Sequence, residues 1–140
     1  MRDSADLREE FRMRHFVFSM VVAAATMLPG VASAQAGDPA AGQRVFNQCR
    51  ACHTPEKGGR HGVGPNLWGV VGRNAASIEG FRYSANMREV AEGGLAWNEA
   101  NLRAYLTNPK AVVPRGSMSF AGLRNEQQLN DLIAYQNTLK

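Results

Sequence analysis

Hydrophobic side chains after residue 37 recur at the three- and four-residue spacings of short helices, and glycine-rich stretches separate these segments. The first helix is expected to begin at Asp38, which can cap it, with Pro39 in its first turn. Phe46 and Cys49 share one face of that helix. Cys49 and Cys52 are therefore expected near its end, three residues apart and pointing the same way.

Two further helices are predicted toward the C-terminus. Asn98 can cap one that runs until Pro109 stops it. Asn125 can cap the other, where Gln128 can complete a capping box. Both carry an apolar stripe, made of Leu102, Tyr105 and Leu106 in the first and of Leu129, Leu132, Ile133 and Leu139 in the second. A shorter helix is expected over residues 84–91.

No stretch alternates convincingly between polar and apolar residues with the period of two that a half-buried strand requires. Residues 53–74 are rich in glycine and are expected to form an irregular loop that approaches another group closely. Their spacing does not match the GxGxxG pattern of a dinucleotide site. The fold class predicted from these patterns is all-α, with a few helices and long glycine-rich loops.

The N-terminal segment has the features of a secretory signal. A basic stretch precedes an uncharged apolar run of 13 residues, Phe16–Leu28. That run is shorter than the roughly 20 residues of a bilayer-spanning helix, so a stable membrane insertion is not expected. Ala32-Ser33-Ala34 provides a small-x-small cleavage site, and Ala34-Gln35-Ala36 provides an alternative two residues further on.

Cleavage after Ala34 would divide the chain into a signal peptide, residues 1–34, and one domain, residues 35–140. A start at Met13 would make a tidier signal than one at Met1, and residues 1–12 would then not be translated. The domain carries 12 Lys and Arg against 8 Asp and Glu, spread singly along the chain. Because nucleic acid normally requires a dense basic stripe, that class of partner is excluded.

Candidate chemistry is concentrated in the segment QCRACHT, residues 48–54, which holds the chain's only two cysteines and His53 directly behind the second. A redox disulfide, part of a metal site and covalent attachment of haem all use such a cluster. A thioredoxin-like CxxC needs a parallel sheet, which the pattern does not predict. A zinc site needs four ligands, and the domain offers only Cys49, Cys52, His53 and His61. Haem fits best, because two thiols on one edge can add to two vinyl groups while the adjacent histidine reaches the iron.

The domain holds two methionines, Met87 and Met118, that could complete the coordination of a haem iron. Met118 lies in a loop stiffened by Pro109 and Pro114, whereas Met87 falls in the short helix expected at 84–91 and suits ordinary core packing. Met118 is therefore the predicted second axial ligand. A soft thioether favours ferrous iron and leaves no vacant position, which predicts an electron carrier rather than an enzyme. Without Met118 on the iron, a peroxidase-like or gas-binding haem protein would be the alternative, and without haem a thiol–disulfide module.

On these residues the chain resembles the class I c-type cytochromes, specifically the bacterial cytochromes c of the mitochondrial type. The matching segments occur in family order and cover nearly all of the domain: GDPAAGQRVFNQCRACHT, GVGPNLWGVVGR, EGFRYS, LAWNEANLRAYLTNPK, VVP, MSFAGL and DLIAYQNTL. The resemblance implies a cytochrome c fold around one covalent haem c. It also implies a soluble, monomeric carrier of single electrons in the periplasm. Its partners would be membrane redox complexes, or periplasmic dehydrogenases and oxidases, with acidic docking surfaces.

The resemblance further implies roles for individual residues. Cys49 and Cys52 would bear the haem thioethers, and His53 and Met118 would be the axial ligands of the iron. The carbonyl of Pro65 would orient His53.

The resemblance also implies supporting roles for other aromatic and basic residues. Tyr105 would hydrogen-bond near the Met118 sulfur, and Phe46 would pack on the final helix near Leu132 and Tyr135. The haem propionates would be held by Arg73, Tyr83 and Trp97.

Two segments depart from the family pattern. PRGSM, residues 114–118, replaces the usual PGTKM, and MREVAEGG, residues 87–94, is a few residues longer than in close relatives. Fewer lysines therefore surround the expected haem edge, and Arg50, Arg60 and Arg115 are the basic residues that can take their place.

Overall fold

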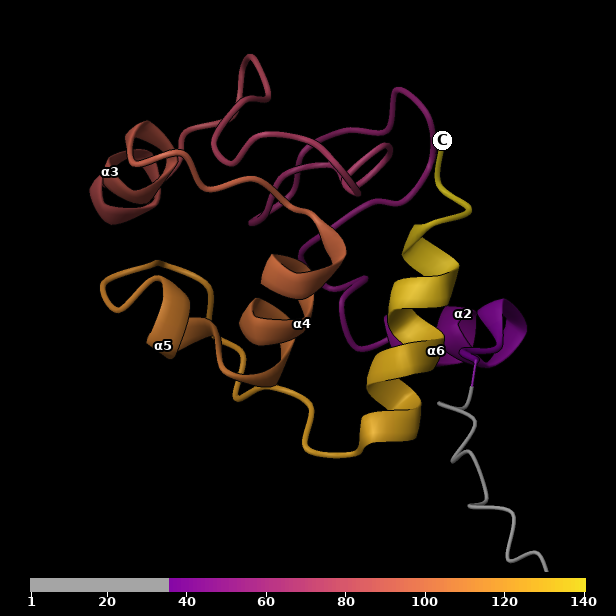
Figure 1. Ribbon diagram of the computed structural model, residues 1–140. Coiled ribbons are helices and arrows are strands. Elements are labelled where there is room, and N and C mark those ends of the chain that lie inside the picture. The colour runs from indigo at the N-terminus through magenta and orange to yellow at the C-terminus, as the bar shows by residue number, and fades with distance from the viewer. Residues whose placement is uncertain (1–35) are drawn as a thin grey trace, which may run out of the picture. The chain divides into compact units, whose positions relative to one another are not determined.

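The computed structural model describes residues 36–140, and the predicted signal peptide with its cleavage site lies outside these residues. Regular structure within the described part is helical apart from an isolated bridge between Asn74 and Ala96. The helices are α2 (Pro39–Phe46), α3 (Ala85–Glu92), α4 (Glu99–Thr107), α5 (Pro109–Val112) and α6 (Glu126–Gln136) (Figure 1). The prediction of an all-α fold with long loops is confirmed. None of the helices in residues 36–140 is long and apolar enough to cross a bilayer.

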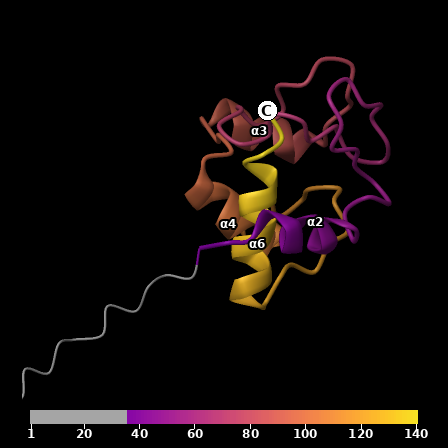
Figure 2. The ribbon, with the colours of Figure 1, turned by 90° about the vertical axis from the view of Figure 1, so that its right-hand side faces the viewer.

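The central packing of the domain is the crossing of α2 over α6 (Figures 1 and 2). Phe46 is completely buried there, and its ring lies 5.3 Å from that of Tyr135. At the start of α2 the backbone N–H of Asp38 donates to the side chain of Asp131 over 2.8 Å. Gly42 permits the close approach, because a Cβ at that position would lie 1.9 Å from the backbone oxygen of Asp131. The expected packing of Phe46 on the last helix is present.

Helix α4 lies between α5 and α6 and carries part of a second apolar cluster (Figure 1). This cluster contains the buried residues Val70, Ala75, Trp97 and Leu102, and the partly buried side chains of Met87 and Tyr105 pack against it. Met87 therefore has the core-filling position that its helical context predicted. Ser84 caps α3 through the backbone N–H of Met87.

The side-chain caps predicted for the other helices are present. Asp38, Asn98 and Asn125 each accept a backbone N–H in the first turn of α2, α4 and α6. Pro109 does more than end a helix, because it begins α5 and Asn108 caps that helix. A proline lacks the N–H that the first turn of a helix would leave unpaired, so it is suited to this position.

The first helix differs from its prediction in length. α2 ends at Phe46, before either cysteine, and residues 47–52 continue as hydrogen-bonded turns. The N–H of Cys49 donates to the carbonyl of Phe46 over 2.8 Å, and that of His53 to the carbonyl of Cys49 over 2.9 Å. The cysteines therefore lie on a tight turn beyond the helix.

Candidate functional site

The turn after α2 presents two thiols and an imidazole. Cys49 and Cys52 are both free and half-buried. Burial, with a smaller contribution from Cys52, raises the pKa of the Cys49 thiol to about 11. Cys49 is therefore a neutral thiol near pH 7.

His53 is held in one orientation by the loop that follows it. Because the carbonyl of Pro65 can only accept, the 2.7 Å contact requires that His53 Nδ1 carries the proton and donates it. Burial lowers the pKa of His53, and this effect outweighs the opposing influence of the Pro65 hydrogen bond. The neutral ring then keeps an unshared electron pair on Nε2, which is the form that binds a metal.

Gly64 allows the loop to press against the His53 ring. A Cβ on Gly64 would lie 2.2 Å from Cε1 and 2.6 Å from Nε2 of His53, which is impossible without moving one of them. The loop therefore fixes the ring by direct contact as well as by the Pro65 hydrogen bond.

Asn66 is the residue that organises this loop, and the sequence did not single it out. Its side-chain N–H2 donates to the carbonyl and hydroxyl of Thr54 and to the carbonyl of Glu56 over 2.8–3.1 Å. Its Oδ1 accepts from the N–H of Trp68 over 3.1 Å. The side chain is buried, with 7% of its surface exposed. The sequence GPN, residues 64–66, indicates a turn. Neighbouring residues do not indicate which carbonyls accept from the Asn66 amide.

Replacing Asn66 by alanine is expected to lower the free energy of unfolding by roughly 2–4 kcal/mol, because several buried polar groups lose their partner at once. Urea unfolding of the purified protein measures this change. Asn74→Ala is the matched control, since Asn74 is exposed in the same loop and should change stability by about 0.5 kcal/mol or less. Equal effects of the two substitutions would contradict the role given to Asn66.

Met118 lies in the loop between α5 and α6, and the structure brings Tyr105 to it. The Tyr105 hydroxyl donates to the Met118 sulfur over 3.8 Å, from 13 positions earlier in the sequence. The Tyr105 ring packs against that of Trp97, with 4.8 Å between the ring centres. Burial raises the pKa of Tyr105 to about 12, so the hydroxyl keeps its proton and remains a donor throughout the physiological range.

Of the three residues that the resemblance assigned to propionates, Arg73 interacts with each of the other two. The guanidinium of Arg73 donates to the carbonyls of Trp68 and Asn66 over 2.8 and 3.3 Å. The backbone N–H of Trp97 donates to the carbonyl of Arg73 over 2.8 Å. Burial lowers the pKa of Arg73, opposed by its electrostatic interaction with Tyr83.

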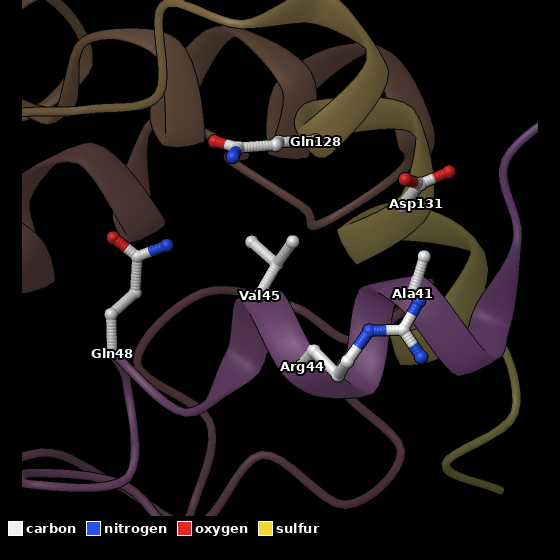
Figure 3. Close-up of a pocket in the computed structure, with 6 residues that line it drawn as sticks. All are labelled: Ala41, Arg44, Val45, Gln48, Gln128 and Asp131. Carbon is white, nitrogen blue, oxygen red and sulfur yellow. The ribbon is translucent and has the colours of Figure 1, made fainter.

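A surface depression between α2 and α6 contains none of these residues. It has a volume of about 420 Å³ and is lined by Ala41, Arg44, Val45, Gln48, Gln128 and Asp131 (Figure 3). Because no thiol, imidazole or thioether lines it, it is not the site of the chemistry. No cluster of three or more His, Cys, Asp or Glu side chains that could hold a metal occurs within residues 36–140.

The donor set suits a covalently attached iron porphyrin. Two neighbouring thiols can form its thioether bonds, and an imidazole with an unprotonated Nε2 and a thioether sulfur can ligate its iron. Half-buried apolar side chains, among them Leu67, Trp68 and Phe120, adjoin the core beside these groups.

Comparison with known proteins agrees with this donor set. The family model described as cytochrome c matches residues 39–140. Cytochrome c2 of Blastochloris viridis is 44% identical over 124 residues, which cover 88% of this chain and 91% of the relative. Cytochrome c-554 of Methylosinus trichosporium is 41% identical over 120 residues, 84% of this chain and 89% of the relative. The solved structure of cytochrome cH from Methylobacterium extorquens superposes with a TM-score of 0.66 at 41% identity, covering 73% of this chain and 99% of that one.

Proposed function

The chain belongs to the cytochrome c family, as a cytochrome c2-type electron carrier with covalent haem rather than an enzyme, and we propose that it carries single electrons through the periplasm. Its partners in this proposal are membrane redox complexes, or a periplasmic dehydrogenase and an oxidase. The observation that carries the proposal is the His53 imidazole, fixed by Pro65 directly behind two half-buried thiols.

The residues of the turn after α2 attach and orient the cofactor in this proposal. Cys49 and Cys52 form the thioether bonds, and His53 ligates through Nε2 because Nδ1 is already used by Pro65. Bound haem would supply one-electron exchange between ferric and ferrous iron. The low pKa of His53 keeps the ring neutral and able to ligate at neutral pH.

Met118 is the second axial ligand in this proposal. Tyr105 donates to the sulfur and so restricts the directions in which its remaining electron pair can point. Because the partly buried Tyr105 hydroxyl stays protonated, it would remain a hydrogen-bond donor to the sulfur in both oxidation states. Arg73, Tyr83 and Trp97 would hold the propionates in this proposal.

The location and partners are supported by sequence features. The apolar run at residues 16–28, followed by small residues at 32–34, supports export and removal of residues 1–34. The net charge of +4 favours encounter with acidic partner surfaces, because complementary charge raises association rates more than affinity. We propose that residues 35–140 act as a monomer.

Expression with export and a haem-attachment pathway tests this function. The wild-type protein is expected to keep its haem on a denaturing gel, with an intact mass equal to residues 35–140 plus one haem. Replacing both Cys49 and Cys52 by alanine should leave no haem on the denatured polypeptide, because no thiol remains to form a thioether bond. Replacing exposed Ser119 by alanine is the control and should retain it. Colourless wild-type protein from a competent host would contradict the proposal.

A further inference from the structure

The loop that carries Met118 is fastened to α3, a helix that is distant in sequence. The backbone N–H of Arg115 donates to Asn86 Oδ1 over 2.9 Å, and the two residues are 29 positions apart. The Arg115 guanidinium donates to Glu89 Oε2 over 2.7 Å. Asn86 closes the group, because its Nδ2 donates to the same Glu89 oxygen over 2.9 Å. We call Asn86, Glu89 and Arg115 the α3 latch.

Burial shows which member of the α3 latch contributes most. The side chains of Arg115 and Glu89 are 73% and 63% exposed, and an ion pair so exposed contributes little because water and salt screen it. Asn86 is only 6% exposed and satisfies a main-chain N–H of the ligand loop. Removing a buried acceptor leaves that N–H unpaired, which is the more damaging loss.

Other polar contacts join this loop to α4 and α5, the two helices that precede it in the sequence. One of them is the hydrogen bond from the N–H of Leu123 to the carbonyl of Leu106, over 2.8 Å. Lys110 donates through Nζ to the carbonyl of Gly116, but Lys110 belongs to α5, which directly precedes the loop and can move with it. Tyr105 acts on the Met118 sulfur and not on the backbone. Asn86 and Glu89 therefore anchor the loop to a separate part of the domain. Asn86 and Glu89 both belong to α3 (Ala85–Glu92), and Arg115 lies three residues before Met118.

We propose that the α3 latch is a positioning device for Met118, which sets how readily the thioether gives way to an external ligand. The inference rests on the proposed role of Met118 as an axial ligand. Asn86 holds the loop backbone three residues before Met118, and Glu89 holds the side chain of the same anchoring residue. While the latch is closed, the loop backbone at Arg115 cannot move away from α3 without breaking the Asn86 and Glu89 contacts. When the latch is broken, the loop opens more often, although the Met118 thioether itself is unchanged.

Titration of the ferric holoprotein with imidazole tests the α3 latch, with the sulfur-to-iron absorption band as the readout. Asn86→Ala is expected to bind imidazole about tenfold more tightly, the factor that corresponds to one buried hydrogen bond. Glu89→Gln should change the affinity by about two- to threefold, as an exposed ion pair implies. Hydrogen exchange at the Arg115 amide should accelerate in Asn86→Ala by a factor similar to the affinity change.

The matched control is Glu99→Gln, which removes an exposed Glu99–Arg103 ion pair on α4 away from the ligand loop. It should leave the imidazole affinity unchanged. Affinities of Asn86→Ala and Glu89→Gln within 1.5-fold of wild type, or an equal shift in Glu99→Gln, would overturn the latch. If Asn86→Ala does not fold, Glu89→Gln decides. A wild-type protein that lacks the sulfur band would instead overturn the ligation by Met118, so the two failures are distinguishable.

Discussion

Replacing Met118 by alanine is expected to abolish the sulfur-to-iron band of the ferric protein and to lower its reduction potential. A fall on the order of 0.1–0.3 V is expected, within the roughly 0.8 V that haem axial ligands span. The physical reason is that a soft thioether stabilises ferrous iron relative to ferric iron, and alanine offers no donor in its place. The Tyr105 hydroxyl loses its acceptor in the same substitution. Added cyanide or imidazole should then bind rapidly.

Absorption spectra in both oxidation states and a redox titration measure these effects. Met87→Ala is the matched control, because Met87 is the domain's other methionine and packs, partly buried, against the apolar cluster that contains Trp97. It should lose stability while keeping the band and the potential. If Met118→Ala retained the band, or Met87→Ala lost it, the assignment of the second axial ligand would be wrong.

Replacing Gly42 by alanine is expected to lower the free energy of unfolding by roughly 3–5 kcal/mol. The added Cβ would lie 1.9 Å from the backbone oxygen of Asp131 and 2.7 Å from the Cβ of Tyr135. Neither neighbour is the end of a flexible side chain, so α2 and α6 must separate. A domain is stable by only about 5–15 kcal/mol, so a large share of the total is at risk.

Thermal or urea unfolding of the holoprotein measures the effect of Gly42→Ala. Gly93→Ala is the matched control: its φ is −70°, and the nearest contact of an added Cβ is 3.3 Å. It should change the stability by less than about 1 kcal/mol. Because Phe46 and the turn that bears Cys49 follow directly from α2, a separated helix pair should also reduce the yield of haem-bearing protein. Equal stability of the two variants would show that the crossing of α2 and α6 is not as close as described.

The local features of this protein could be derived from sequence because neighbouring residues produce them. Helix caps depend on a side chain two or three positions before the N–H it accepts, so Asp38, Asn98 and Asn125 are visible in the sequence. The CxxCH cluster brings two thiols and an imidazole together by chain connectivity alone. The sequence also directed attention to Met118, by elimination of Met87 and by the prolines around it. The exact end of α2 before Cys49 was not predicted, because helix ends depend on packing beyond the cap.

Contacts between distant segments were decided by the tertiary structure. Asn66 and Asn86 have no local pattern that names their partners, since a buried amide is useful only where folding brings carbonyls and N–H groups to it. Gly42 could have been a flexible position or a site of close approach, and only the position of Asp131 distinguishes the two. Sequence therefore determined which groups can attach and ligate a cofactor. The packing of α2 on α6, and of the ligand loop on α3, decided how firmly those groups are held. These contacts join segments that are distant in the sequence, so they form only when the chain folds.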